Sequence, residues 1–307
     1  MMALFGGERM TESLRGLRLI AGRAGWIVPF GYYVPVTAVL IVHFLSPGNP
    51  PGQDAVLYRS AAVAFLQGSD PWAVGTPASH FAGTPATILA FMPMTLIPEE
   101  AWRAISIVLN GLIAGAIMVR LRLSLAWLLY PPISIAVLIG QPALLLMGLL
   151  LSPLAALAPL INPYGGVPLL WRHRALAVAI ALGVATVLIA PGLWVDWIQR
   201  LPAISSRLAL ELHDAEPLWL IMLGALALLV VVKERPQHAP WLAVSALWPL
   251  PEYHYAILAM PTALPLVLFG LAIVPGSLTV VLYAAWLLAS RYGLPRIPAL
   301  RIRPMSG

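Results

Sequence analysis

The sequence contains no cysteine and few charged side chains. Without thiols the chain can form no disulfide bond, cannot use thiol catalysis and cannot bind a metal through cysteine. Only 10% of the residues are charged, whereas soluble globular domains have roughly 25%. Hydrophobic residues make up 60% of the chain, and the mean hydropathy is +0.88. This composition excludes an ordinary soluble domain and indicates a membrane protein whose chain crosses the bilayer several times.

A long polar segment is also absent, because apolar segments recur from Trp26 to Ser290. We therefore expect one transmembrane domain with a short segment on either side. The first apolar segment is too long for a removable signal peptide, and its end does not resemble a cleavage site. The predicted parts are a cytoplasmic N-terminal segment (1–25), the transmembrane domain (26–290) with an external loop (46–85), and a basic C-terminal tail (291–307).

The apolar segments predict an all-α fold, a polytopic bundle of transmembrane helices. The candidate spans are 26–45, 86–98, 101–119, 121–139, 142–161, 175–195, 218–232, 240–250, 255–274 and 277–290. A full crossing needs about 20 residues, so the short segments 86–98, 240–250 and 277–290 could be tilted or re-entrant, and we expect about eight to ten crossings. Many of the 30 prolines lie inside or beside these segments, which favours an irregular bundle around a pocket.

Positive charge is carried almost entirely by arginine, with 17 Arg against the single Lys233. These Arg gather in short clusters between apolar segments, which is typical of cytoplasmic loops beside anionic lipid. We therefore expect membrane lipids, and not nucleic acid, as partners. The clusters before residue 26, at 171–174 and at 233–235 predict a cytoplasmic N-terminus and put the loops 46–85 and 196–217 outside. The cluster at 291–303 leaves the side of the C-terminus open.

Aspartate is scarce, and two of the four Asp residues, Asp54 and Asp70, lie in the first external loop. A carboxylate at a membrane face, flanked by apolar surface, can take a proton from an incoming hydroxyl, so Asp54 is a candidate general base. Residues 55–67 have helical composition and predict a helix that lies at the membrane interface, ended by Gly68. Asp54 and Tyr58 would share one face at its start. Asp54 is equally compatible with a role as the N-cap residue of that helix.

Other polar and aromatic side chains near the predicted external face allow two readings each. Arg59 could bind a phosphate, because a guanidinium grips phosphate through two hydrogen bonds, or it could contact a lipid headgroup. Asp70 could act in catalysis or form a turn, and Gln141 could bind the substrate or be a polar bridge between helices. Trp72 and Trp248 could stack on a sugar or isoprenoid, or belong to the aromatic belt at the bilayer boundary.

The order of these motifs resembles glycosyltransferase family 87, whose members are multi-pass enzymes of the GT-C superfamily. The resemblance rests on Asp54, Tyr58, the turn at 68–72, the segment 81–85 that leads into the second apolar span, Gly140-Gln141, and the segments 162–164, 172–174 and 248–255. It implies a GT-C-like bundle in the plasma (inner) membrane, with the active site on the extracytoplasmic face. It also implies an inverting glycosyltransferase that moves a mannose-like hexose from a polyprenyl-phosphate-linked donor to an acceptor hydroxyl on a lipid or glycan.

The resemblance further implies roles for individual residues. Asp54 is the expected general base, and His254 is the expected second catalytic residue, which holds the donor phosphate or the acceptor. The resemblance implies no metal and no other cofactor. The expected substrate-binding residues are Tyr58, Arg59, Asp70, Trp72, Gln141, Asn162, Trp248 and Glu252.

Three differences from the family pattern support a second hypothesis. Asn162 stands where the family usually has Lys, Gly83 stands where an aromatic residue is expected, and only one span fits between Gln141 and Asn162. These differences are compatible with a non-catalytic, GT-C-derived scaffold subunit of a membrane complex. A transporter would place ionisable groups in mid-membrane, whereas the charges here cluster at the ends of the predicted spans.

Overall fold

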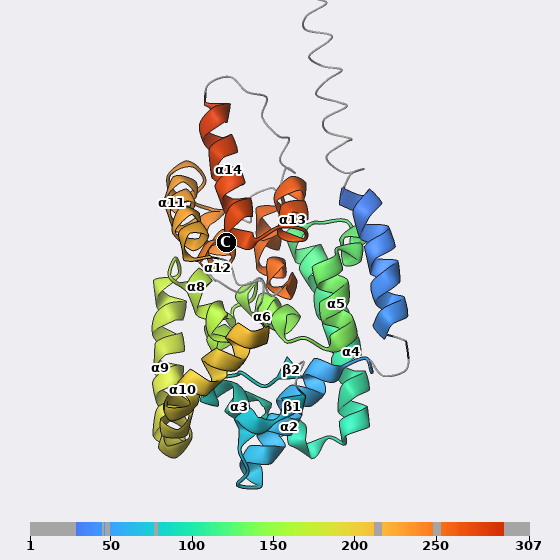
Figure 1. Cartoon of the computed structure of the whole chain (residues 1–307), viewed down its shortest axis with the longest axis vertical. Coiled ribbons are helices and arrows are strands. Elements are labelled where there is room, and N and C mark those ends of the chain that lie inside the picture. The colour runs from blue at the N-terminus through green and yellow to red at the C-terminus, as the bar shows by residue number, and fades with distance from the viewer. Residues whose placement is uncertain are drawn as a thin grey trace, which may run out of the picture.

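The computed structural model describes residues 29–44, 46, 50–76, 79–211, 217–247 and 253–291. Within these ranges the regular structure is helical, apart from the antiparallel pair β1 (Gly75–Thr76) and β2 (Ser79–His80). The prediction of an all-α fold is confirmed. In Figure 1, α9 lies on the left and α4 on the right with α6 between them, and α2, α3 and the β1–β2 pair lie in the lower part of the bundle.

The helices vary widely in length. In chain order the α-helices are Pro29–Phe44, α2 (Gln53–Leu66), α3 (Pro85–Phe91), α4 (Glu99–Leu121), α5 (Pro131–Ile139), α6 (Ala143–Leu150), α7 (Ala158–Ile161), α8 (Gly166–Leu169), α9 (His173–Ile189), α10 (Pro191–Glu211), α11 (Leu218–Glu234), α12 (Ala239–Leu247), α13 (Pro265–Leu271) and α14 (Gly276–Ser290). Short 3₁₀ helices connect them: η1 (Pro71–Ala73), η2 (Met92–Leu96), η3 (Leu125–Leu129), η4 (Ala155–Leu157), η5 (Pro163–Gly165) and η6 (Tyr253–Thr262).

Among the described residues, α4 alone is long and apolar enough to cross a bilayer as one straight helix. Its 23 residues extend over about 34 Å, slightly more than a hydrocarbon core of about 30 Å. The number of spans rises to three if two sharply bent pairs each count as one: α5 with α6, bent by 114°, and α9 with the first part of α10, bent by 100°. These apolar helices are compatible with a membrane, whereas eight to ten crossings are not confirmed.

Several of the predicted spans are not single helices, and two of them show the cause. The segment 142–161 is divided into α6, η4 and α7, and the segment 255–274 is divided into η6 and α13. Proline explains both breaks, because it lacks a backbone N–H and its ring clashes with the preceding turn of a helix. Pro153 follows α6 and Pro159 lies in the first turn of α7, while Pro265 begins α13.

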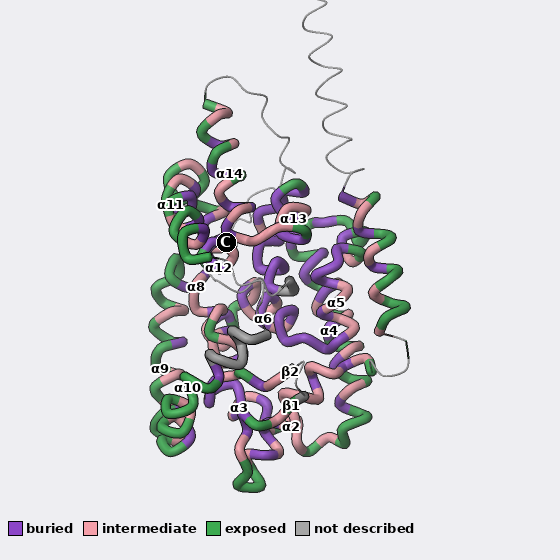
Figure 2. Tube along the Cα trace, in the orientation of Figure 1, coloured by how far each residue is buried: buried purple, intermediate pink, exposed green. Residues whose placement is uncertain are grey.

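The outer helices present apolar side chains to the surroundings, and the buried segments gather at the centre of the bundle (Figure 2). Large exposed apolar patches are unusual on soluble monomers and suit contact with lipid. The exposed residues include Val108, Leu112 and Val119 on α4, Val178, Ile180, Val184 and Leu188 on α9, and Met222, Leu226 and Leu229 on α11. The outer surface therefore fits a membrane protein.

The break between α5 and α6 lies in the core, and α4 satisfies its polar groups. Asn110 of α4, 5% exposed, donates through Nδ2 to the carbonyl oxygens of Ala136 and Gln141, at 3.1 Å each. The side-chain oxygen of Gln141 accepts from the backbone N–H of Ala143 at 3.0 Å. A bent apolar segment needs such partners, because lipid offers none. Asn110 was not among the residues predicted from the sequence.

Replacing Asn110 with leucine is expected to lower the free energy of unfolding by about 2 kcal/mol, because the buried carbonyl oxygen of Gln141 loses its side-chain donor and that of Ala136 keeps only its backbone donors. Thermal unfolding of the purified protein in detergent measures the loss. Leu112→Ala, on the same helix and 68% exposed, is the matched control and should change stability by less than about 0.5 kcal/mol. If both variants are equally stable, Asn110 does not hold the break together.

Candidate functional site

The first external loop contains the helix that the sequence predicts, and Asp54 lies in its first turn. Helix α2 begins at Gln53, and its N-cap is Gly52, whose backbone is left-handed with φ of 76°. The interpretation of Asp54 as the N-cap is therefore wrong, since the cap position requires a backbone conformation that favours glycine. Asp54 is half-buried and lies at the N-terminal end of the helix, where the helix dipole is positive. Gly68, with φ of 70°, follows the end of α2 as predicted.

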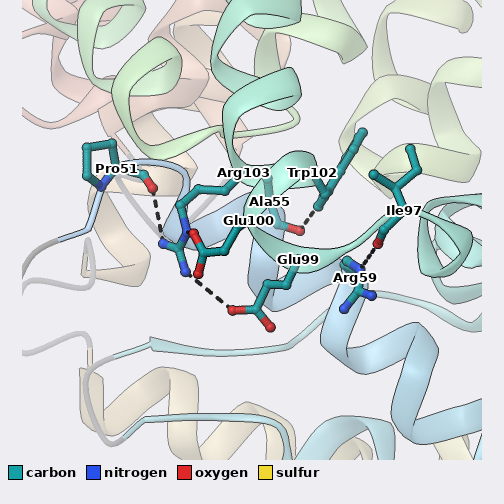
Figure 3. Close-up of polar contacts among 8 residues, drawn as sticks. All are labelled: Pro51, Ala55, Arg59, Ile97, Glu99, Glu100, Trp102 and Arg103. Carbon is teal, nitrogen blue, oxygen red and sulfur yellow. Dashed lines mark hydrogen bonds and ion pairs between the residues drawn. The ribbon is translucent and has the colours of Figure 1, made fainter.

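Two side chains of α4 hold the backbone on either side of Asp54 (Figure 3). Arg103 donates through Nη1 to the carbonyl oxygen of Pro51 at 3.1 Å. The indole N–H of Trp102 donates to the carbonyl oxygen of Ala55 at 2.8 Å. The start of α2 is thus tied to the N-terminal part of α4 at two points, and this pairing fixes the backbone that carries the Asp54 carboxylate.

A third contact joins the same turn to α5. The backbone N–H of Gly52 donates to the carbonyl oxygen of Leu138 at 2.8 Å. Arg103 is itself held by Glu99 and Glu100, each at 3.4 Å. The guanidinium of Arg103 is therefore used to position the backbone and is shared with two carboxylates.

Tyr58 and Arg59 point to different neighbours. The ring of Tyr58 packs against Phe81 and Phe91, with centroid distances of 5.4 and 5.0 Å. Arg59 donates through Nε to the carbonyl oxygen of Ile97 at 2.9 Å and through Nη2 to that of Thr95 at 3.4 Å (Figure 3 draws the contact with Ile97). A guanidinium has five N–H donors, so Arg59 keeps donors beyond those used at the end of η2.

The predicted turn at Asp70 is bound to a distant helix. Asp70 accepts from the backbone N–H of Trp72 at 3.0 Å and forms an ion pair with Arg200 of α10. The guanidinium of Arg200 lies 6.0 Å from the Trp72 ring centroid, and the Trp72 indole donates to the carbonyl oxygen of Gly83 at 2.9 Å. Asp70 is thus a turn former, and the loops predicted to lie on one side, 46–85 and 196–217, meet at one end of the bundle.

Asn162 joins η5 to η6. Its Nδ2 donates to the hydroxyl of Tyr255, and its Oδ1 accepts from the backbone N–H of Tyr164 at 3.1 Å. The rings of Tyr164 and Tyr255 meet edge to face at 4.8 Å. The late motif therefore packs directly on the segment that contains Asn162.

Helix α3 connects the early motif with these later segments. Phe91 of α3 touches Tyr58 of α2, and Thr87 of α3 donates through its hydroxyl to the carbonyl oxygen of Ile161 at 3.1 Å. Ile161 directly precedes Asn162. Residues 58, 87–91, 161–162 and 255 thus form one series of contacts that runs from α2 through α3 and the end of α7 to η6.

Not every predicted site residue can be placed in this set. Trp248 and Glu252 lie outside the described residues, as does the side chain of His254, although the backbone of His254 belongs to η6 next to Tyr255. Gln141 serves the helix break described above. The contributors that were not singled out from the sequence include Trp102, Arg103, Arg200 and Tyr255. Within the part of the chain that is described, no group of three or more His, Asp and Glu side chains could hold a metal ion.

A separate polar pair lies at the connection between α11 and α12. His238 Nδ1 and the Tyr283 hydroxyl are 2.7 Å apart. Burial and, to a smaller extent, the positive charge of nearby Arg235 together lower the pKa of His238 from 6.5 to about 4. The imidazole is therefore neutral in the folded protein at physiological pH.

This lowered pKa predicts a pH dependence of stability. The unfolded chain binds a proton at His238 near pH 6.5, whereas the folded chain binds it only near pH 4, so stability should fall as the pH falls through this window and level off below it. His238→Gln should flatten that part of the profile, measured as the unfolding midpoint in detergent between pH 4 and 8. His173→Gln, at the exposed start of α9, is the control and should leave the slope unchanged. An unaltered slope in His238→Gln would contradict the assignment.

Comparisons of the chain with protein-family models, with curated proteins and with solved structures found no match. What the chain does must therefore be inferred from its own residues and contacts. The most informative of these is the fixed position of Asp54 at the start of α2.

Proposed function

We propose that this chain is a membrane glycosyltransferase that transfers a hexose from a polyprenyl-phosphate donor to an acceptor hydroxyl, with Asp54 as the general base. One observation carries the proposal: a half-buried carboxylate in the first turn of α2, whose backbone is held by α4 and α5. A general base must be held within hydrogen-bond reach of the proton that it removes. The contacts that hold the backbone around Asp54 meet that requirement.

The proposed step is a single inverting displacement. As the acceptor oxygen forms a bond to the anomeric carbon, its proton passes to the Asp54 carboxylate. The bond between the anomeric carbon and the phosphate oxygen breaks, and both electrons stay on the polyprenyl phosphate. A phosphate leaving group needs little help from an acid, so one well-placed base is sufficient.

Two residues that follow Asp54 closely in the sequence, together with Asn162, supply candidate substrate contacts. Tyr58 lies one helical turn further along α2, Arg59 keeps N–H donors for a phosphate, and Asn162 keeps one N–H of its amide. We assign the donor phosphate to Arg59 and Asn162, and we assign His254 to the donor phosphate or the acceptor. Asp70 and Trp72 hold the loop between α2 and α3 in place.

The proposal also includes the position in the cell. A polytopic, GT-C-like bundle in the plasma (inner) membrane would present the end that carries α2 and Arg200 to the extracytoplasmic side. The exposed apolar faces of α4, α9 and α11 support contact with lipid.

Binding of polyprenyl phosphate tests the proposal without knowledge of the sugar, because this part is common to all such donors. Native mass spectrometry of the purified chain should detect a complex with polyprenyl phosphate, and incubation with polyprenyl-phosphate mannose and a hydroxyl acceptor should release free polyprenyl phosphate. Failure to bind the lipid phosphate would contradict the proposal, whichever hexose is transferred.

A scaffold function is the second candidate, and specific contacts favour it. The Arg103 guanidinium is occupied by Pro51 and two glutamates, and Arg59 is partly occupied by backbone carbonyls. Asn162 offers no charge to a phosphate. A scaffold would co-purify with unrelated subunits in fixed stoichiometry and would not bind polyprenyl phosphate.

A further inference from the structure

Four exposed cations lie where two apolar helices end, on the surface between α8, α9, α11 and α12. Arg172 and Arg174 are at the start of α9, Lys233 is in the last turn of α11, and Arg235 is its C-cap. Helices α8 and α12 pack together, and the Arg172 guanidinium lies 5.6 Å from the ring centroid of Trp241 in α12. The two pairs of cations therefore belong to one side of the bundle, and we call these four residues the basic edge.

The positive charge of the basic edge is not neutralised by neighbouring carboxylates. In the described ranges, none of the four residues forms an ion pair, whereas Arg103, Arg200 and Arg291 do. Glu234, which lies between Lys233 and Arg235 in sequence, is already bound by Arg291 at the end of α14, at 3.0 Å. The basic edge thus has an uncompensated positive potential that favours an anion.

Arg172 is the best-fixed member of the basic edge. Its Nη1 donates to the carbonyl oxygen of Leu150 at 2.7 Å, and its planar group rests against Trp241. These two contacts hold one face and one N–H of the guanidinium, and the remaining N–H donors are left for a ligand. A guanidinium fixed in this way binds a phosphate group through two parallel hydrogen bonds with a smaller loss of side-chain freedom.

The position of the basic edge matches the headgroup region of a bilayer. Helices α9 and α11 have 17 residues each and are about 26 Å long, close to the hydrocarbon thickness of about 30 Å. The exposed apolar residues nearest these ends are Val178 on α9 and Val232 on α11, each within about two helical turns of the end. Trp171, 39% exposed, adds the type of residue that is enriched at the membrane–water boundary.

We propose that the basic edge is a binding site for the phosphate headgroup of an anionic phospholipid, with Arg172 as its anchor and Arg174, Lys233 and Arg235 as the surrounding positive charge. This site is independent of the proposed glycosyl transfer, because it involves neither α2 nor its partners. A zwitterionic headgroup would bind less tightly, because its own positive charge is repelled by the basic edge.

Native mass spectrometry of the full chain in detergent tests the proposal by comparing phosphatidylglycerol with phosphatidylcholine of the same acyl chains. Phosphatidylglycerol should bind about tenfold more tightly, and Arg172→Gln should remove about that factor, since one cation and its hydrogen bonds are lost. Arg120→Gln, which removes an exposed charge at the end of α4, is the matched control and should change the affinity by less than about twofold.

Several results would overturn the proposal. These are equal binding of the two lipids, an equal loss in Arg172→Gln and Arg120→Gln, and displacement of the lipid by excess inorganic phosphate, which would identify a site for a soluble anion. If Arg172→Gln does not fold, the double variant Lys233→Gln/Arg235→Gln, whose side chains are exposed, should still lose about tenfold in affinity. Unchanged affinity in this double variant would show that the basic edge does not bind the lipid.

Discussion

Replacing Asp54 with asparagine is expected to lower the rate of hexose transfer by about 100- to 10,000-fold, the usual contribution of a general base. An amide has nearly the same size and shape as a carboxylate, but it cannot accept the proton of the attacking hydroxyl. The backbone contacts that hold the start of α2 come from Arg103, Trp102 and Leu138 and do not involve the Asp54 side chain. These backbone contacts should therefore persist in the variant.

The measurement is the turnover of polyprenyl-phosphate hexose at saturating donor, together with the KM for the donor. Because Asp54 acts on the acceptor proton, kcat should fall while the donor KM stays within about threefold. Asp196→Asn, an exposed aspartate on α10, is the matched control and should retain full activity. Unchanged turnover in Asp54→Asn would exclude Asp54 as the base.

The sequence predicted those features that depend on local signals. The helix α2, its end at Gly68 and the turn at Asp70 follow from composition and from turn-forming residues close together in the chain. The shared location of the loops 46–85 and 196–217 followed from the distribution of arginine, and the ion pair between Asp70 and Arg200 agrees with it. Turn-forming residues act over a few positions, and the distribution of arginine acts over whole segments. A single sequence shows both kinds of signal.

The sequence did not predict partners that are distant along the chain. Asn110 reaches a carbonyl group 31 residues away, Arg103 one 52 residues away, and Asn162 a hydroxyl 93 residues away. No periodicity connects such pairs, because each depends on how the helices pack. The choice of Gly52 over Asp54 as the N-cap has the same origin, since the left-handed turn there fits between Arg103 and Leu138.

The division of the span 142–161 has a different cause. Average hydropathy treats this segment as continuous, but Pro153 and Pro159 break the helix inside it. In a membrane protein such breaks persist where neighbouring helices satisfy the freed carbonyl groups, as Asn110 does for the break between α5 and α6. Proline positions therefore deserve more weight than segment averages in assigning these helices.

The second large effect is expected from Gly52→Ala, which should lower the free energy of unfolding by about 3 kcal/mol. A Cβ atom at this position would lie 2.7 Å from Cγ of Arg103 and 3.1 Å from its carbonyl oxygen. The left-handed backbone, with φ of 76°, adds about 1–2 kcal/mol of strain for any L-residue, and the overpacking adds about 1–3 kcal/mol. Arg103 has little freedom to move away, because Pro51 and the two glutamates hold it.

Gly68→Ala separates these two contributions, because Gly68 has nearly the same φ, 70°, and nothing within 4 Å of its added Cβ. The free energy of unfolding of this variant should fall only by the strain energy, about 1–2 kcal/mol. In the double variant Gly52→Ala/Arg103→Ala the closest contact is removed, so its loss should be smaller than the sum of the two single losses. The free energy of unfolding in detergent is measured for Gly52→Ala, Gly68→Ala, Arg103→Ala and the double variant. Equal losses of stability in Gly52→Ala and Gly68→Ala would show that Arg103 does not constrain this turn. Because a shift of about 1 Å in a catalytic group can cost about 100-fold in rate, the same Gly52→Ala protein should also lose transfer activity, whereas Gly68→Ala should keep it.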